Sequence, residues 1–476
     1  MLQRFRENLA LLLAALLPLH AFAVTVLTKV LKGSGESPLA MIAIWKEALL
    51  LLILVIAVIE IGRRIVKSGQ WAVVSAVDLI DISILIALVY SVLIHPWSAD
   101  SAMTSYIYGF RYDFVPLITF LILRRVEWSE YFLRSAPKML VIVGAIVAGY
   151  GLLSLVLPER WFSFLGYSSM HSLYFPDGPI AAFQYISESG IRRIQSTFSG
   201  PNQMGLWLLV PLSLMLGKKK IREVVSDKWL VVSIAFILIA IVLSFSRASW
   251  IGALVIGLVF FAPKIQLRFL TLSALALIVL GVTAATLFPA VIVRSISSSA
   301  HITRPLAALH TIAEHPFGKG LGSAGPASNR TSDPCVYLPL GADIAWTETV
   351  EKLCVFMDGK QFHPSDRTCN CPVLSENWYL QWGVELGLLG LFISLLMPFF
   401  VLRKLIMNNE QLIMTNAWRS VAAAFLGISI AALFLHAFED SAISYTLWIL
   451  LSATLPLWKV SVAQSSSSTS ADSTRT

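Results

Sequence analysis

Long apolar stretches recur along the chain and are separated by short charged or Gly/Pro-rich segments. A helix needs about twenty mainly apolar residues to cross the hydrocarbon core of a bilayer, where the backbone must satisfy its own hydrogen bonds. The pattern therefore predicts an all-α, polytopic bundle with about twelve membrane spans. The predicted spans are 8–27, 39–61, 71–94, 110–123, 138–157, 201–216, 229–245, 249–262, 268–290, 379–400, 418–438 and 442–459.

Composition supports this class and excludes an ordinary soluble enzyme, because 57% of residues are hydrophobic and only 13% are charged. Lys and Arg gather in every second loop, and positively charged short loops stay in the cytoplasm. Both termini are therefore predicted inside, and the long loops 158–200 and 291–378 outside. The excess of Lys and Arg over Asp and Glu is explained by the basic inner loops, so it does not indicate a nucleic-acid partner. The basic inner loops are represented by Arg63, Arg124, Lys218, Lys264 and Arg403.

Loop lengths and composition divide the chain into four parts. They are residues 1–290 with the first nine helices and the outer loop near 158–200, the large outer loop 291–378, the last three helices in 379–460, and a Ser-rich tail, 461–476, which is expected to be disordered. The first apolar run ends Ala21-Phe22-Ala23 and also resembles a secretory signal peptide. We favour an uncleaved first span, because polytopic proteins commonly begin in this way.

All four cysteines fall in the large outer loop. They are Cys335, Cys354, Cys369 and Cys371. This placement predicts an oxidising compartment and two disulfides. The Cys369-Asn370-Cys371 spacing disfavours a mutual bond, so each of these two should pair with Cys335 or Cys354, and both assignments stay open. The alternative is a metal site that joins the thiols with His363, which we disfavour because thiolate zinc sites belong mostly to reducing compartments.

Three arginines on the predicted outer side are candidates for binding an anion. Arg193 precedes a span whose first residues, up to Asn202, present free backbone N–H groups, and such a helix N-terminus attracts anions. Arg247 lies in a tight outer turn, against the positive-inside pattern. Arg304 begins a predicted surface helix. Each alone is compatible with interfacial snorkelling, but the set predicts an anion site.

The surface helix is predicted to begin with Thr303 as its N-cap and Pro305 in its first turn. A Gly-rich segment, 320–325, follows it and matches the dinucleotide fingerprint in its letters alone. It follows no buried strand, so a flexible loop is expected there.

Glu376 is the predicted general base, because a carboxylate beside apolar span residues is well placed to abstract a proton. The alternative is that Glu376 belongs to the cap of the tenth span together with Ser375 or Asn377. Isolated outer histidines are expected to be solvated, with His301 and His363 as the next candidate bases.

The remaining charged residues near the spans are expected to be structural. Lys46 and Glu47 should pair with each other, and Asp78 and Asp81 should share a helix face near the inner surface. Glu439 and Asp440, at the outer end of a span, should be solvated.

Several segments, taken in order, resemble the O-antigen ligase and Wzy-type O-antigen polymerase superfamily. The segments are Tyr108-Gly109-Phe110-Arg111-Tyr112-Asp113-Phe114, Arg193 through Asn202, Ser246-Arg247, Arg304 with His315-Pro316-Phe317-Gly318-Lys319-Gly320-Leu321-Gly322, and Glu376-Asn377-Trp378-Tyr379-Leu380-Gln381. The resemblance covers roughly residues 105–400, and its specificity lies in the order and spacing of the segments.

This resemblance implies a multi-pass bacterial inner-membrane glycosyltransferase that uses undecaprenyl-pyrophosphate-linked glycans, with no cofactor. Membrane lipids and a glycan or lipid acceptor would be its other partners. Arg193, Arg247 and Arg304 would then hold the pyrophosphate. The substrate-binding residues implied are Arg111, Asn202, Asn377 and Tyr379. Ligases that act on lipid A-core carry a histidine where Glu376 stands, so the resemblance leaves open polymerase activity or another acceptor.

The sequence therefore predicts an inverting transferase in which Glu376 deprotonates an acceptor hydroxyl and the arginines stabilise the departing pyrophosphate. The alternative is a transporter or flippase of the same lipid-linked glycans. A transporter would place polar residues and broken helices near the middle of the membrane, whereas here the polar candidates gather at the outer face.

Overall fold

A computed structural model describes residues 1–33, 38–68, 76–94, 103–167, 181–186, 188–217, 227–262, 279, 282–283, 285–338, 341–350, 353–407 and 417–457. Within these residues the protein is mostly helical. The expected disordered tail 461–476 and most of the predicted span 268–290 lie outside the described residues.

The helices fall into two halves of the chain. The first half contains α1 (Leu2–Leu16), η1 (Leu17–Leu19), α2 (His20–Lys32), α3 (Ala40–Ala43), α4 (Trp45–Ser68), α6 (Leu79–Ile94), α7 (Met103–Gly109), η3 (Phe110–Phe114), α8 (Val115–Leu123), α9 (Glu130–Leu153), α10 (Glu159–Phe164) and α11 (Pro201–Leu216). The second half contains α12 (Asp227–Leu243), α13 (Arg247–Phe261), α15 (Pro289–Ile292), α16 (Ser295–Glu314), α17 (Gly325–Thr331), η6 (Ala345–Thr349), α18 (Trp378–Met407), α19 (Ala417–Ala431) and α20 (Ser441–Thr454).

Among the described residues, four helical stretches are long and apolar enough to cross a membrane. They are Leu2–Lys32, Met103–Leu123, Glu130–Leu153 and Trp378–Met407. Several other apolar helices are shorter; α20, with 14 residues, rises only about 21 Å against a hydrocarbon core of about 30 Å. The described helices therefore support a membrane protein, and the predicted total of about twelve spans is not shown by them.

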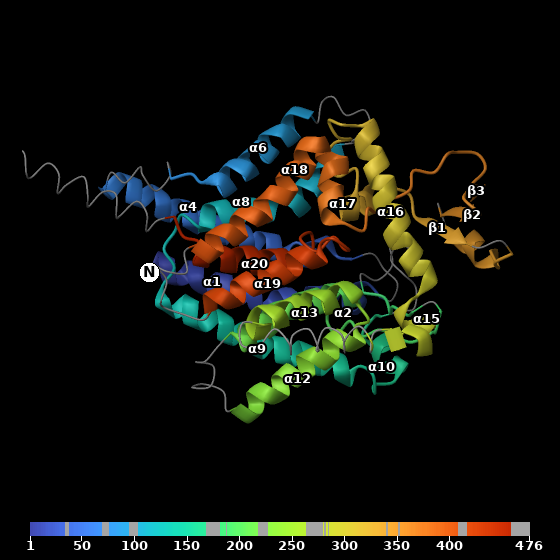
Figure 1. Cartoon of the computed structure of the whole chain (residues 1–476), viewed down its shortest axis with the longest axis horizontal. Helices are drawn as coiled ribbons and strands as arrows, with labels where there is room; N and C mark the ends of the chain where they lie inside the picture. The colour runs from blue at the N-terminus through green and yellow to red at the C-terminus, as the bar shows by residue number, and fades with distance from the viewer. Residues whose placement is uncertain are drawn as a thin grey trace, which may run out of the picture.

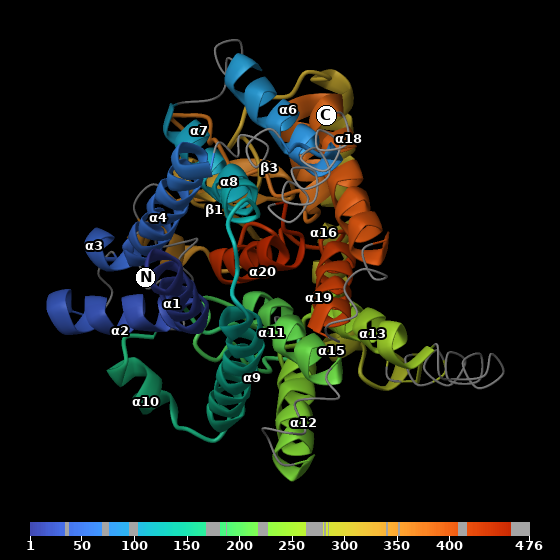
Figure 2. The ribbon, with the colours of Figure 1, turned by 90° about the vertical axis from the view of Figure 1, so that its left-hand side faces the viewer.

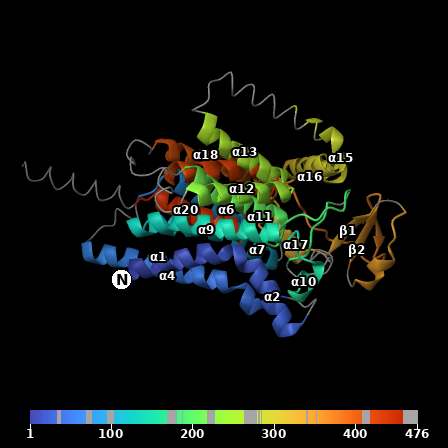
Figure 3. The same ribbon diagram turned by 90° about the horizontal axis from the view of Figure 1, so that it is seen from below.

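The centre of the bundle is formed by α11 and α20, whose residues are buried on nearly every side. Both sequences are apolar around the whole helix, which is the pattern of a helix enclosed by others. The helix α11 packs against α9, α12, α13 and α19, and α20 packs against α8 and α19 (Figure 2). The helices α1 and α4 pack together and form one side of the bundle (Figure 3).

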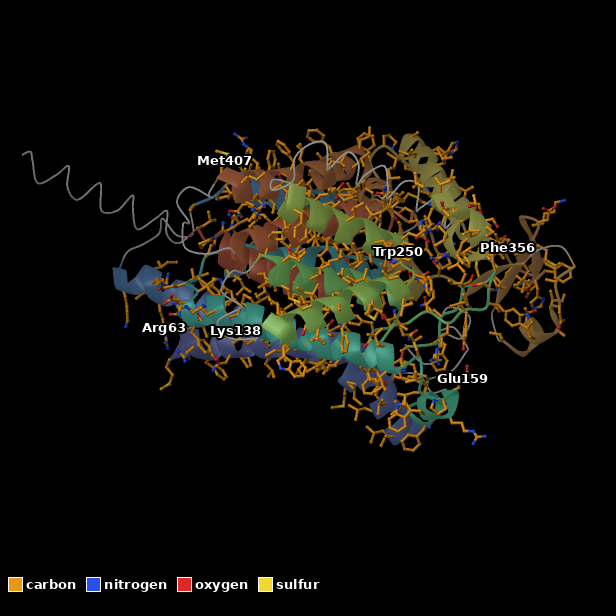
Figure 4. The ribbon with its side chains drawn as sticks, turned by 60° about the horizontal axis from the view of Figure 1, so that its bottom comes forward. Arg63, Lys138, Glu159, Trp250, Phe356 and Met407 are labelled. Atoms are coloured by element: carbon orange, nitrogen blue, oxygen red, sulfur yellow. A yellow bond between two sulfur atoms is a disulfide. The ribbon has the colours of Figure 1, made fainter. Side chains whose placement is uncertain are left out.

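The labelled residues distinguish the two ends of the bundle. Arg63 and Lys138 lie at one end, and Glu159 and Phe356 lie at the other (Figure 4). The first end is the predicted inner one, and the second is called the outer end below. At the inner end, buried Arg124 donates to Asp78 and to Asp81, at 3.0 and 2.8 Å. The structural role predicted for these two carboxylates is confirmed.

At the outer end, α16 runs along the ends of the other helices and packs on α18, and a small sheet projects beyond it (Figure 1). The predicted start of this helix at Thr303 is wrong, because α16 begins at Ser295 and Pro305 lies inside it. The Thr303 hydroxyl is 3.0 Å from the Ser299 carbonyl oxygen, so it donates backwards within the helix and caps nothing.

The sheet has the order β1 (Cys335–Leu338), β2 (Cys354–Met357), β3 (Lys360–His363), with a parallel pair followed by an antiparallel one. Cys335 is bonded to Cys371, and Cys354 to Cys369. The predicted two disulfides, with Cys369 and Cys371 on different partners, are confirmed. Because every cysteine is used, the alternative metal site built on free thiols does not form.

Non-reducing peptide mapping of the purified protein is expected to yield two cross-linked peptides, Cys335 with Cys371 and Cys354 with Cys369. Replacing Cys354 and Cys369 together by Ser should lower the free energy of unfolding of this unit by about 2–4 kcal/mol, because a disulfide restricts the unfolded chain. The opposite pairing, or free thiols in the mapped protein, would contradict the assignment.

Candidate active site at the outer end

An arginine group surrounds the turn between α12 and α13. Arg193 Nε donates to the Ser244 carbonyl oxygen over 2.9 Å, and Arg294 Nη2 donates to the Phe245 carbonyl oxygen over 2.6 Å. Arg247, the first residue of α13, reaches across to α16 and donates to Ser298 Oγ over 2.7 Å. The structure thus brings Arg193 and Arg247 together, as predicted, and adds Arg294.

The charges of this arginine group repel one another. Burial, and then the positive charges of Arg294 and Arg247, lower the pKa of Arg193 to about 9. Burial and Arg247 also lower the pKa of Arg294, and Glu188 acts on it in the opposite direction. Arg193 remains a cation at neutral pH, so a bound anion would relieve the repulsion. Cations that are buried or half-buried in this arrangement are suited to binding a phosphate-bearing group.

Asn202 has a supporting role in the arginine group. Its Oδ1 accepts a hydrogen bond from Arg193 Nη2 over 2.7 Å. Asn202 is in the first turn of α11, where Pro201 follows the extended N-cap Gly200. The side chain therefore fixes the guanidinium at the N-terminus of this helix, as in the predicted anion site. Direct contact of Asn202 with substrate stays a prediction.

A second charged group lies between α16 and the start of α18. Arg304 forms an ion pair with Glu376 Oε1, and His301 Nδ1 lies 3.9 Å from Glu376 Oε2. The expectation that His301 is simply solvated is wrong, because its side chain is only 29% exposed. The charges of Arg247 and Arg294 also act on His301. His301 therefore connects the arginine group to Glu376.

The helix cap at α18 is Asn377 and not Glu376. Asn377 Oδ1 accepts the Leu380 N–H over 3.0 Å, while its Nδ2 donates to the Leu433 carbonyl oxygen over 3.0 Å. The carboxylate of Glu376 points instead to Arg304. The alternative in which Glu376 serves as the helix cap is therefore not supported. The amide of Asn377 is occupied by the scaffold, and its predicted contact with substrate stays a prediction.

Strained backbone gathers at the same place. Five described non-glycine residues have positive φ, and Asp358, one of them, lies between β2 and β3. The other four are Ser196, Phe245, Arg294 and Glu376, at φ of 50°, 50°, 47° and 51°. Each of these four lies in the arginine group, in the loop next to it, or at the start of α18. A left-handed conformation costs a non-glycine residue about 1–2 kcal/mol, and such strain concentrates at functional sites. This observation marks the outer end as the candidate site.

The other predicted substrate-binding residues lie elsewhere. Arg111 forms an ion pair with Glu47, so Glu47 is shared between Arg111 and Lys46, the latter at 3.9 Å. Arg111 is thus engaged outside the arginine group. The hydroxyl of Tyr379 is buried and donates to the Ser429 carbonyl oxygen over 2.7 Å. For both residues, substrate binding stays a prediction.

The helix α18 is interrupted at Gly387, and the segment that follows α16 forms hydrogen bonds with the backbone at this interruption. Gly387 has φ 67° and ψ −159°, which interrupts the helix. The Lys319 N–H donates to the Val384 carbonyl oxygen, and the Gly320 N–H to the Glu385 carbonyl oxygen, over 2.9 and 3.0 Å. The Glu385 side chain accepts the N–H of Gly322 over 3.0 Å. The expected flexible loop is therefore a packed segment that joins α16 to α18.

Buried carboxyl groups surround this junction. Trp382 Nε1 donates to Asp113 Oδ1 over 2.9 Å, and Gln381 Nε2 donates to Glu439. The expected solvation of Glu439 is wrong, since this residue is buried. Asp440 caps α20 by accepting the Ala442 N–H over 2.9 Å. The junction therefore ties α7–η3, α18 and α20 together behind the charged site.

Gly322→Ala is expected to lower the free energy of unfolding by more than about 4 kcal/mol, because an added Cβ would overlap the Ser105 carbonyl oxygen. Gly341→Ala is the matched control: Gly341 has φ 80° against 82° for Gly322, and a Cβ there meets nothing within 4 Å. The control should lower the free energy of unfolding by only about 1–2 kcal/mol, which is the cost of placing a residue with a Cβ in the left-handed conformation. Thermal unfolding in detergent, followed by tryptophan fluorescence, measures both; equal losses would contradict the packing described.

Sequence reasoning missed Arg294 and His436, and named His301 only as one of the next candidate bases. Both ring nitrogens of His436 are buried without a hydrogen-bond partner among the described residues, and the charges of Glu376 and Arg304 act on this ring. A signal for His301 was present, because residues three apart share a helix face and His301 precedes Arg304 by three. No comparable local signal marks Arg294 or His436.

Comparison with known proteins adds no assignment. No model of a known protein family matches the chain, and no curated protein matches it significantly. Function is therefore inferred from the resemblance of the motifs and from the geometry of the outer end.

Proposed function

We propose that this protein is a membrane glycosyltransferase of the O-antigen ligase or polymerase type. It would transfer a glycan from undecaprenyl pyrophosphate to an acceptor glycan or lipid on the outer face of the bacterial inner membrane. The observation that carries the proposal is the arginine group of Arg193, Arg247 and Arg294, which stands next to the carboxylate–imidazole pair of Glu376 and His301.

The two charged groups suit the two bond changes of such a reaction, one broken at the donor and one formed at the acceptor. Breaking the bond between the anomeric carbon and the pyrophosphate leaves negative charge on oxygen, and preorganised guanidinium groups stabilise that charge. Forming the new glycosidic bond requires removal of a proton from the acceptor hydroxyl, and the pair of Glu376 and His301 supplies acceptors for it. Attack from the face opposite the leaving group would invert the anomeric centre. The chemistry needs no cofactor.

A specific observation also favours the transporter alternative, because α18 is broken at Gly387 and buried carboxyl groups lie beside the break. Broken helices next to buried charge are common in secondary transporters. Gly387 lies nine residues, or about 14 Å, from the outer start of α18, so its depth alone does not separate the two functions. However, the backbone of 316–322 fills the break with hydrogen bonds, so it leaves no open site for a substrate there. We therefore favour the transferase.

A deletion strain separates these functions. Loss of a transferase should deplete the surface glycan and cause the undecaprenyl-pyrophosphate glycan to accumulate on the outer face, where a membrane-impermeant glycosidase added to spheroplasts removes it. Loss of a flippase should leave the same donor protected inside. Mass analysis of the lipid-linked glycans, with the wild-type chain restored as control, gives the readout. An unchanged donor pool would reject both functions.

A further inference from the structure

The carboxylate of Glu376 is already engaged by a cation. Arg304, one turn further along α16 than His301, forms an ion pair with its Oε1. The guanidinium occupies Oε1, so a substrate hydroxyl would have to displace it to reach this oxygen. The ion pair does fix the position of the carboxylate, whose other oxygen faces His301.

Within the described part of the chain, the imidazole of His301, unlike Glu376 Oε1, is not engaged by a cation. Its Nδ1 has no hydrogen-bond partner among the described residues and lies 3.9 Å from Glu376 Oε2, a gap that a small rotation of the ring would close. Its side chain keeps 29% of its surface exposed, so a substrate hydroxyl can reach the ring. The arrangement of an imidazole with a carboxylate behind it is that of a general base with an orienting partner.

We propose that His301 is the general base of glycan transfer and that Glu376, held by Arg304, orients its imidazole; this rests on the transferase function proposed above. With Nδ1–H directed at Glu376, Nε2 accepts the proton of the acceptor hydroxyl. The acceptor oxygen bonds to the anomeric carbon while the bond from that carbon to the pyrophosphate oxygen breaks. The bonding electron pair leaves with the pyrophosphate, whose charge is met by Arg193, Arg247 and Arg294.

Burial, together with the nearby arginines, favours the neutral form of this base. Burial lowers the pKa of His301 below its ordinary value; Glu376 raises it, and Arg247, Arg304 and Arg294 lower it further. His436, in the turn before α20, is the other titratable ring near Glu376. A general base acts in its neutral form, so the rate rises with pH through its pKa. The ascending limb of the wild-type profile should therefore lie below the ordinary histidine pKa of about 6.5.

The test uses purified full-length protein in detergent, with donor isolated from the deletion strain and release of undecaprenyl pyrophosphate as the readout. His301→Gln is expected to lower kcat by about 10²–10⁴-fold and to lose the ascending limb, with KM for the donor nearly unchanged. His301→Asn provides a second variant, and binding of inorganic pyrophosphate verifies that each variant is folded. His310→Gln, on the same helix with a side chain 74% exposed, is the control and should match the wild type.

Each outcome decides between the assignments. A kcat within a few-fold of wild type in both His301 variants, with the ascending limb retained, overturns the proposal. Loss of that limb in His436→Gln but not in the His301 variants moves the base to His436 and also overturns it. A wild-type protein that releases no undecaprenyl pyrophosphate rejects the transferase function itself, which is a different result from an active wild type with unaffected His301 variants.

Discussion

Glu376→Gln is expected to reduce the turnover of glycan transfer by about 10²–10⁴-fold while leaving binding of inorganic pyrophosphate unchanged. The amide keeps the shape of the side chain but loses the negative charge that faces His301 and pairs with Arg304. It can neither accept a proton nor stabilise a protonated imidazole. Release of undecaprenyl pyrophosphate under saturating donor measures the loss.

Glu314→Gln is the matched control for this variant. Glu314 is also an acidic residue paired with a histidine, His310, but its side chain is 58% exposed at the far end of α16. Exposed pairs contribute little, so this variant should keep wild-type turnover. If Glu376→Gln also transfers glycan at the wild-type rate, neither a catalytic nor an orienting role for Glu376 survives.

Arg193→Ala is expected to abolish glycan transfer and to weaken binding of inorganic pyrophosphate by about 10–100-fold. Losing a charge-assisted hydrogen bond costs about 1.5–3 kcal/mol, and about 1.4 kcal/mol corresponds to a factor of ten in affinity. Arg193→Lys should be intermediate, because a point charge lacks the planar fork of a guanidinium. Arg247→Ala and Arg294→Ala should behave like Arg193→Ala. Isothermal titration with inorganic pyrophosphate in detergent measures the affinities.

Arg192→Ala is the control next to Arg193 in the chain. The guanidinium of Arg192 lies over Phe162 and Phe183, with its carbon 5.2 and 5.5 Å from the ring centroids, and contributes nothing to the arginine group. This variant should therefore keep the wild-type affinity for pyrophosphate. Wild-type affinity and transfer in the Arg193, Arg247 and Arg294 variants together would remove the basis of the anion site.

The helical class was predictable from the sequence, and so was the placement of the candidate residues toward one end of the bundle, because both follow from local rules. Apolar runs indicate helices that bury themselves in lipid or in other helices, and the position of Lys and Arg distinguishes the two ends. The two disulfides were predictable in the same way, since the confinement of all four cysteines to one outer loop left few possible pairings. Helix lengths were less predictable: the sequence favours Pro305 as a first-turn residue, yet the helix begins ten residues earlier at Ser295.

The identity of the partners in the site was not predictable in the same way. Arg304 was expected to join Arg193 and Arg247, but it pairs with Glu376, and Arg294 takes its place beside them. These contacts depend on where α16 crosses the ends of the bundle, which no periodicity encodes. The burial of Glu439 was not predictable for a similar reason, because Gln381, which donates to its carboxylate, is 58 residues away in the chain.

By itself, the sequence determined a mostly helical, apolar protein with one disulfide-bonded outer loop and a set of outer arginines near an acidic residue. Burial of apolar area and the avoidance of buried charge act on each segment separately, so composition and spacing suffice for these features. Only the tertiary structure decided that His301 stands between Glu376 and the arginine group, and that the Gly-rich segment closes the break in α18. Such contacts join residues distant in the chain, and their geometry exists only after the helices have packed.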